Sequence, residues 1–364
     1  MSDFQKRRNI DDETIDKVVA GLNSKFIESL PEDPVFIAQK YARRRETPFI
    51  SPSINANLRE MMFEHILPDE DYLKVLYKIM AFTFNGKKRT GKPSSHILLS
   101  QTGGGKSNLR ERILTENEGI VVIDSDSYKR FRDDSTEIQE KHPQFYGALT
   151  GIDCYDHVEN VSRFTMEQGY DFLIEGAPSV SQGVIGINFD KLEQLEYAIN
   201  YDALAVGDIV SQMAVHKRYE QALRDEKLKD SAKLTDIDRH NDSYAAVVLV
   251  LQNSSPESSI EIYRRGTDEE CRVPQKIESE KEKEHKIETL EEYRRRSNEE
   301  YITSHQFARD YNWVKNMMEE REAPEIQRVQ LNTVLQNAKL RAAQISAEYA
   351  RNFEKEIEEY IDRD

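Results

Sequence analysis

Cysteine is nearly absent from this chain of 364 residues, which contains only Cys154 and Cys271. Two distant cysteines in unlike contexts provide neither a disulfide framework nor a paired metal site. A reducing compartment fits this composition. The eight histidines show no HExxH spacing, which argues against a metal cage made only of protein ligands.

Long hydrophobic runs are missing as well. No segment approaches the roughly 18 to 20 consecutive apolar residues that a membrane span needs. The N-terminal residues MSDFQKRRNI also lack the apolar core of a signal peptide. We therefore expect a soluble, cytoplasmic protein with no membrane partner.

Basic side chains are outnumbered, because 51 lysines and arginines face 67 aspartates and glutamates, for a net charge of −16. A surface of this sign repels phosphate backbones, so we do not expect nucleic acid as a partner. The length is sufficient for two or three domains with a sizeable core.

Residues 1–90 are expected to be helical. Apolar residues recur at helical spacing over Asp11–Asn23 and Asn57–Phe82, and prolines between these segments predict several short helices rather than one long one. The basic, apolar-poor segment NGKKRTGKPSS at residues 85–95 marks a domain boundary. We therefore predict a helical N-terminal region (1–90), a central domain (94–270) and a charged helical C-terminal region (275–364).

Short apolar runs alternate with helical stretches in the central domain, which predicts an α/β fold with a parallel sheet and crossover helices. The predicted strands are His96–Leu99, Ile120–Ile123, Phe172–Ile174, Ala203–Val206 and Ile260–Tyr263. The segment Tyr244–Leu251 suits a strand by its β-branched composition and a helix by its position.

In the C-terminal region, Pro324 divides two helical halves. The second half carries one narrow apolar seam, formed by Leu331, Leu335, Ala338, Ala342, Ile345 and Tyr349. Two interpretations are open: a helix packed on its own core, or an intermolecular coiled coil. We favour the first, because the heptad pattern lasts for barely three repeats.

The segment HILLSQTGGGKSNLRERI at residues 96–113 combines an apolar strand, a glycine-rich turn and a helix start. It matches GxxxxGK[ST] except that Ser100 replaces the first glycine. Gly103, Gly104 and Gly105 allow backbone N–H groups to close around phosphate oxygens. Lys106 adds a point charge, and the Ser107 hydroxyl can join the coordination of Mg²⁺. The pattern predicts a P-loop NTPase-like domain that binds a nucleotide, and a glycine-rich turn that merely caps a helix is the plainer alternative.

Two further strand ends carry carboxylates. Asp124 and Asp126 follow the second predicted strand, and they point the same way if the chain stays extended, so that one serves a metal and the other a substrate hydroxyl. Glu175 follows the third strand at the same sheet edge, after Gly169 ends the preceding helix. The plainer alternative is a strand-end turn for the two aspartates, and a helix-capping or salt-bridged glutamate for Glu175.

A basic helix and loop, residues 216–234, is the fourth segment of interest. A solvated charged face is the default interpretation of such a run. Phosphoryl transfer between two polyanions nevertheless needs added cations, which Arg218, Arg224 or Lys233 could supply.

The order and spacing of these segments resemble the zeta toxin family, the kinases of bacterial toxin–antitoxin modules. The resemblance rests on SQTGGGKS, IDSDSY and LIEG and covers roughly residues 94–266. It implies an ATP-dependent kinase, toxic to cells, that phosphorylates a nucleotide-sugar, typically UDP-N-acetylglucosamine at its 3′-hydroxyl, or a related nucleotide metabolite.

By position, the resemblance implies that Lys106 and Arg218 contact the ATP phosphates and that Ser107 binds the metal. It also implies that Glu175 holds the sugar and that Asp126 is the catalytic base. The catalytic group would thus be Asp126, Lys106 and Arg218. We further assign Asp124 to the metal site, Asn108 to the ATP site, and Ser127, with Asp126, to the substrate site.

The chain also departs from the family's pattern. A second family arginine corresponds to Lys233, before Thr235 and His240, and Arg239 or Arg224 are its alternatives. A compact ammonium weakens bidentate phosphate contact. Ala177 stands where the family commonly has threonine, and an insertion spans residues 129–141, so the identity of the sugar is left open. The family also implies a helix over Ser243–Leu251.

Two other functions are open. One is a nucleotide-gated interaction protein without a phosphoryl acceptor, which the long helical flanks motivate, and the other is a polynucleotide kinase. Family members are usually restrained by a small helical antitoxin. We hypothesise an antitoxin in trans, or inhibition in cis by residues 1–90, which directly precede the phosphate loop.

Overall fold

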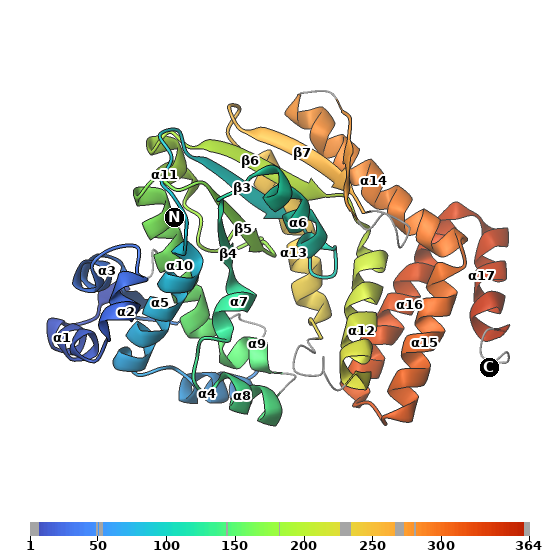
Figure 1. Cartoon of the computed structure of the whole chain (residues 1–364). Coiled ribbons are helices and arrows are strands. Elements are labelled where there is room, and N and C mark those ends of the chain that lie inside the picture. The colour runs from blue at the N-terminus through green and yellow to red at the C-terminus, as the bar shows by residue number, and fades with distance from the viewer. Residues whose placement is uncertain are drawn as a thin grey trace. The chain divides into compact units, whose positions relative to one another are not determined.

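The computed structural model describes residues 7–48, 50, 54–142, 145–181, 183–225, 234–265, 273–279 and 282–359. Its strands form a two-stranded sheet and a six-stranded sheet of order β4-β5-β3-β6-β7-β8 (Figure 1). The predicted α/β class, with helical N- and C-terminal regions, is confirmed. None of the helices within the described ranges is long and apolar enough to cross a membrane.

All five strands predicted from apolar runs are present in the larger sheet. Its strands are β3 (Ser94–Leu99), β4 (Val121–Asp124), β5 (Phe172–Gly176), β6 (Ala198–Leu204), β7 (Ser259–Arg264) and β8 (Gln275–Ile277). The β4–β5 and β6–β7 pairs are parallel. The fourth predicted strand, Ala203–Val206, overlaps only the end of β6, which begins at Ala198 and ends at Leu204.

The central sheet is mostly parallel, as predicted, with an exception at β8, which pairs antiparallel with β7. This strand has three residues, and only Ile277 is buried. So short and polar a segment has no alternating pattern that could reveal it. The β1–β2 ribbon, Arg7–Asn9 with Arg43–Arg45, was missed for a similar reason, because arginines dominate both strands.

The N-terminal region consists of short helices, as predicted. They are α1 (Asp12–Ala20), α2 (Ser24–Glu28), α3 (Pro34–Tyr41), α4 (Ala56–Glu64) and α5 (Asp69–Phe84). The side chains of Asp11, Asn23, Asp33 and Asn55 each accept a hydrogen bond from the first turn of the helix that follows. These N-caps fix where four of the helices start.

The remaining helices follow the phosphate loop. They are α6 (Lys106–Glu116), α7 (Ser125–Lys129), α8 (Ser135–Lys141), α9 (Tyr146–Leu149), α10 (Gly151–Glu167), α11 (Phe189–Gln194), α12 (Asp208–Arg224), α13 (Ile237–Gln252), α14 (Lys283–Thr303), α15 (Gln306–Glu320), α16 (Glu325–Ile345) and α17 (Ala347–Glu359). The ambiguous segment Tyr244–Leu251 is part of helix α13, as the family resemblance implied.

The chain divides into two compact units that do not follow sequence order. The first unit comprises residues Met1–Ile97, Glu116–Gly176 and Ile185–Ile199. The second unit comprises Leu98–Thr115, Ala177–Val184 and Asn200–Asp364. The predicted division at residues 1–90, 94–270 and 275–364 stays a prediction.

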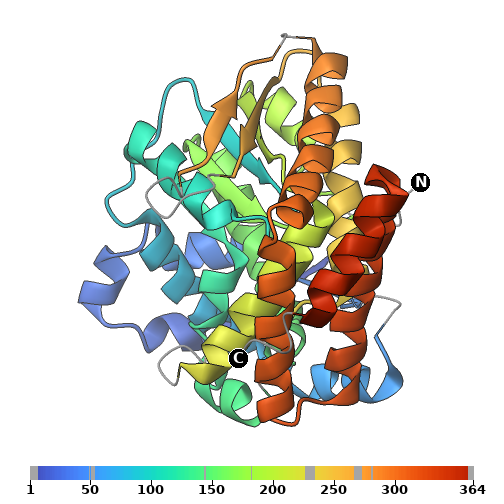
Figure 2. The same ribbon diagram turned by 90° about the vertical axis from the view of Figure 1, so that its right-hand side faces the viewer.

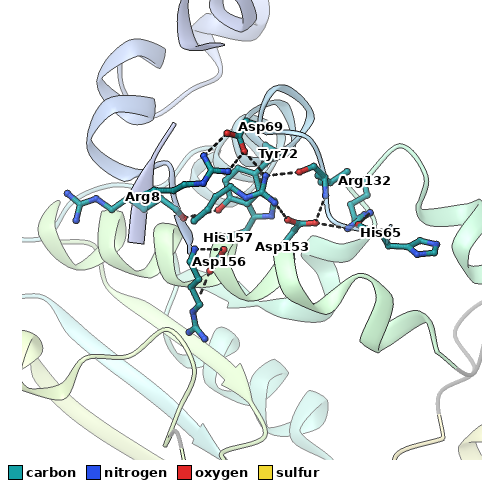
Figure 3. Close-up of polar contacts among 12 residues, drawn as sticks. Arg8, His65, Asp69, Tyr72, Arg132, Asp153, Asp156 and His157 are labelled. Atoms are coloured by element: carbon teal, nitrogen blue, oxygen red, sulfur yellow. Dashed lines mark hydrogen bonds and ion pairs between the residues drawn. The ribbon is translucent and has the colours of Figure 1, made fainter. Parts of the chain in front are cut away.

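In the first unit, buried ion pairs join the N-terminal region to helix α10 (Figure 3). Arg44 Nη2 donates to Asp153 Oδ1 at 2.5 Å, and Arg132 Nη1 donates to Asp153 Oδ2 at 2.9 Å. Asp153 also accepts from the Leu67 backbone N–H at 3.0 Å. Burial raises the pKa of Asp153, and the two guanidiniums oppose that rise. The N-terminal region is therefore an integral part of this unit.

In the second unit, the C-terminal helices share one apolar core with α12 (Figures 1 and 2). Leu331, Ala338 and Ala342 of the predicted seam are buried there, while Ile345 is 39 % exposed. The preferred interpretation, a helix packed on its own core, is confirmed for the buried positions. The seam ends at Ser346, whose extended backbone separates α16 from α17.

The buried Asp153 gives a prediction about stability. Asp153→Asn keeps the shape but removes the buried carboxylate that Arg44 and Arg132 share, and leaves each guanidinium with only its second carboxylate, Asp69 or Asp134. We expect the free energy of unfolding in urea to fall by about 3 to 5 kcal/mol. Glu137→Gln, at an exposed pair with Lys141, is the matched control and should cost under about 0.5 kcal/mol. Equal effects of the two variants would contradict the prediction.

Buried His157 gives a prediction about pH. Burial lowers its pKa to about 3, below the ordinary value of 6.5. Below pH 6.5 the unfolded chain therefore binds a proton that the folded chain refuses, so stability falls as the pH falls. Relative to His157→Gln, the wild type should lose about 2 to 3 kcal/mol of unfolding free energy between about pH 7 and pH 4.5. Parallel curves of stability against pH would contradict this.

Candidate active site

The glycine-rich loop joins β3 to α6 in the second unit. Gly103 has φ +76° and Gly105 has φ +96°, the left-handed region that favours glycine. A Cβ at position 103 would lie 2.1 Å from the Ser211 carbonyl oxygen of α12. A Cβ at Gly104 would lie 2.0 Å from Ser100 Oγ, whereas one at Gly105 would meet nothing within 4 Å. Two of the three glycines are thus required by packing, and Gly105 leaves open space beside the backbone.

Lys106 and Ser107 open helix α6, as the motif predicts. Lys106 Nζ donates to the carbonyl oxygens of Ser100 at 3.2 Å and Gln101 at 3.0 Å, so its side chain folds back across the loop. Ser107 and Asn108 are exposed in the first helical turn. The first N–H groups of a helix have no partner within the helix and attract anions. The loop therefore presents an ammonium group, a hydroxyl and a helix N-terminus within a few residues.

Ser100, the departure from the motif's first glycine, is fully buried. Its Oγ has no hydrogen-bond partner among the described residues. The side chain occupies the space that a Cβ at position 104 would need. Serine at position 100 therefore makes glycine obligatory at position 104.

The candidate carboxylates lie in the first unit. β4 ends at Asp124 and helix α7 starts at Ser125, so Asp126 is in the first helical turn. The prediction that Asp124 and Asp126 project alike from an extended strand is wrong for that reason. Asp124 caps the helix, accepting from the Asp126 N–H at 2.9 Å and from Ser127 Oγ at 2.7 Å. Asp124 is thus the N-cap of α7, a role that was not predicted from the sequence.

Asp126 has a partner that the sequence did not reveal. Lys129 Nζ donates to Asp126 Oδ1 at 2.9 Å, and the Lys129 side chain is only 7 % exposed against 61 % for Asp126. Burial alone would lower the pKa of Lys129, but the Asp126 carboxylate outweighs it and the pKa is raised. A permanent cation therefore anchors the exposed carboxylate. The spacing of three residues within a helix was the available signal.

Glu175 lies beside Asp124, since the two are register partners in the parallel β4–β5 pair. Gly169, before the strand, has φ +70° and follows the end of α10. The predicted helix stop there is confirmed. The structure thus brings Asp124, Asp126, Ser127 and Glu175 together at the carboxyl ends of two adjacent strands.

The predicted arginines and lysine of the basic segment fall in three situations. Arg218 is exposed on α12 and makes no ion pair with the described residues. Lys233 lies outside the described residues. Arg239, an alternative to it, donates to the carbonyl oxygens of Ala177 at 2.7 Å and Pro178 at 3.0 Å. A third N–H group of Arg239 donates to Asp242 Oδ2 at 2.8 Å, so Arg239 is not a free substitute. Arg224 is exposed.

Sequence reasoning missed the polar contacts behind the loop. Gln101 Nε2 donates to the Val206 carbonyl oxygen and to Ser211 Oγ, both at 2.9 Å. Ser211 Oγ also lies 2.8 Å from His240 Nε2. Burial lowers the pKa of His240 to about 4, so the imidazole is neutral near pH 7. His240 therefore supplies a positioning contact to helix α12, which packs on the loop.

The family model described as zeta toxin matches residues 81–277, which is more than half of the chain. The chain belongs to the zeta toxin family. The match includes the glycine-rich loop, both strand ends with carboxylates, and the basic segment.

Individual zeta toxin relatives are more distant. The chain is 28 % identical over 155 residues to a protein named toxin zeta from Streptococcus pyogenes, covering 39 % of this chain and 50 % of the relative. It is 27 % identical over 155 residues to toxin zeta from Enterococcus hirae. The chain thus spans about half the length of these curated relatives.

A solved structure is also similar. It comes from a study of the PezAT chromosomal toxin–antitoxin system of Streptococcus pneumoniae, with 20 % identity and a TM-score of 0.48. The match covers 62 % of this chain and 89 % of that one.

The packing of the loop gives a prediction. Gly103→Ala places a methyl group against the backbone of α12 and forces a left-handed alanine. We expect the unfolding free energy to fall by at least about 2 kcal/mol, from overpacking and backbone strain. Gly91→Ala, where a Cβ meets nothing within 4 Å, is the control and should leave the urea midpoint unchanged. A Gly103→Ala midpoint equal to the control's would disprove the close contact.

Proposed function

We propose that this zeta toxin family member is an ATP-dependent small-molecule kinase. It transfers the γ-phosphoryl group to a hydroxyl of a nucleotide-sugar, UDP-N-acetylglucosamine at its 3′-OH or a related nucleotide metabolite, and is toxic to cells. The observation that carries the proposal is the glycine-rich loop, which ends at a helix N-terminus with an ammonium and a hydroxyl group. That arrangement suits the outer phosphates of a nucleotide.

In this proposal Gly103, Gly104 and Gly105 shape the loop, and Lys106 binds the ATP phosphates. Gly105 supports this role, because the space beside its backbone is open. Asn108 lies in the first turn of the same helix. Arg218 and Lys233 supply further cations for the transferred group. The exposure of Arg218, away from any ion pair with the described residues, leaves its guanidinium available.

Magnesium would be held by Ser107, whose hydroxyl is exposed at the start of α6. Asp124 is the second proposed ligand. Its two oxygens each accept one hydrogen bond from α7, which holds the carboxylate in place at the end of β4. When bound, the ion would neutralise charge on the outer phosphates. Both residue types are oxygen donors of the kind that Mg²⁺ prefers.

Asp126 is the proposed catalytic base, and Glu175 holds the acceptor. The exposed Asp126 carboxylate is fixed by the buried Lys129, so it can orient an acceptor hydroxyl without rotating freely. Glu175, paired in register with Asp124, offers a second carboxylate to the sugar hydroxyls. Ser127 uses its hydroxyl hydrogen on Asp124, so its oxygen would act toward the substrate as an acceptor.

An antitoxin, in trans or formed in cis by residues 1–90, is part of the proposal. The buried Arg44–Asp153 pair bears on how the cis version is tested. Deleting residues 1–90 would strip Asp153 of a partner and destabilise the unit, whatever its regulatory effect. Exposed substitutions in this region are therefore the informative ones. Action in the cytoplasm likewise remains a prediction.

The proposed activity is tested by incubating the purified chain with ATP, Mg²⁺ and a bacterial metabolite extract. A kinase converts one metabolite into a product heavier by one phosphoryl group, in an amount that equals the ATP consumed. A nucleotide-sugar is the expected acceptor. ATP binding without such a product would favour a nucleotide-gated interaction protein. Transfer to added oligonucleotides would favour a polynucleotide kinase.

The role of Asp126 gives a prediction. Asp126→Asn should lower phosphoryl transfer by about 10² to 10⁴-fold, because the acceptor loses its base. ATP affinity should change little, since the loop is untouched. Asp133→Asn is the control, at a surface carboxylate that is 86 % exposed and bonded to Lys78. Transfer within a few-fold of wild type in Asp126→Asn would refute the assignment.

A further inference from the structure

Helix α14 lies beyond the family match, which ends at residue 277. It nevertheless brings a charged side chain behind the phosphate loop of the second unit. Arg294 is 2 % exposed and is among the largest fully buried side chains of the described chain. A guanidinium is almost never buried so completely without a carboxylate partner.

The contacts of Arg294 are to neutral groups. Nη1 donates to the Tyr244 carbonyl oxygen at 3.1 Å, and the guanidinium carbon lies 4.0 Å from the Tyr244 ring centroid. Nη2 makes a long contact of 3.5 Å with Gln101 Oε1. Nε has no hydrogen-bond partner, and no carboxylate in the described ranges pairs with the group. Within the described structure Arg294 therefore has no direct contact with a carboxylate, and Glu291 and Asp208 act on its charge only through space.

Gln101 connects this charge to the loop. Its backbone oxygen accepts from Lys106 Nζ at 3.0 Å and from the Gly104 N–H at 3.3 Å. Its side-chain nitrogen donates to Val206 and Ser211, and its side-chain oxygen faces Arg294. One residue thus joins Arg294 to the ammonium and the glycine turn of the candidate site.

The position of α14 is fixed by close packing on the start of α12. Asn298 Nδ2 donates to Asp208 Oδ1 at 2.6 Å, and Asn298 Oδ1 accepts from the Ile209 N–H at 3.2 Å. Gly207 leaves no room for a side chain, since a Cβ there would lie 1.9 Å from Asn298 Oδ1. Arg294, one turn before Asn298, is held rigidly behind the loop.

We propose that Arg294 is a positioning residue of the phosphate loop whose charge is balanced by the phosphates of the bound nucleotide. It holds the Gln101 side chain and supplies a fixed positive charge outside the family's own motifs. A buried charge needs a counter-charge, and an ATP-binding loop receives one with its ligand. This inference rests on the proposed function, because it requires that the loop binds ATP.

The test uses the full-length chain and Arg294→Met, which removes the charge and keeps much of the volume. Dissociation constants for ATP, ADP and AMP are measured by calorimetry with Mg²⁺, and urea unfolding is followed without nucleotide. We expect the dissociation constant for ATP to rise at least about tenfold. The dissociation constant for ADP should rise less, and that for AMP should change little. The unfolding midpoint without nucleotide should be unchanged or higher, because a buried charge without a direct carboxylate contact has been removed.

Two control variants separate charge from structure. Arg294→Lys keeps the charge and should stay within a few-fold of the wild-type ATP affinity. Arg295→Met, at an exposed pair with Glu299 on the same helix, should change neither quantity. If Arg294 has a merely structural role, Arg294→Met would instead lower the unfolding midpoint and weaken the binding of all three nucleotides equally. That result would overturn the proposal.

The remaining outcomes are also decisive. If both Arg294→Met and Arg294→Gln fail to fold, the fold itself needs the charge, and the proposal is wrong. If Arg294→Lys loses as much ATP affinity as Arg294→Met, charge is not the cause. A wild-type chain that binds no ATP would refute the proposed function itself. Wild-type binding with an unaffected Arg294→Met would refute this inference alone.

Discussion

The cost of burying charge governs much of this structure. In the first unit, Arg44 and Arg132 share the buried carboxylate of Asp153, and each also pairs with a second carboxylate, Asp69 or Asp134. Lys129 is buried because it reaches Asp126 at its exposed end. Arg294 is the exception, since its contacts are neutral. Each buried cation is thus either satisfied by the fold or placed where a bound anion could satisfy it.

Local patterns in the sequence predicted most of the fold. Apolar runs gave five strands of the central sheet, and the loop motif placed Lys106 and Ser107 at a helix start, as found. Pro324 separates the C-terminal helices as expected. These features depend on interactions within a few residues, or on a strand's need for burial, and such constraints are written directly in the order of side chains.

What could not be predicted depends on contacts between distant segments. Nothing near Asp153 indicates that Arg44 will share its carboxylate, and nothing near Arg294 indicates that Gln101 will lie beside it. The candidate site was predicted in composition but not in conformation. Asp126 proved helical because Asp124 caps the turn, a competition between strand and cap that spacing alone does not decide.

The close approach of Gly207 and Asn298 affects where this chain can be shortened without loss of structure. Asn298 satisfies an amide group at the start of α12, the helix on which the glycine loop packs. A recombinant fragment cut where the homologous segment stops would lose that cap and uncover the apolar surface of α12. The family match ends at residue 277, whereas a fragment that folds by itself must also include helix α14.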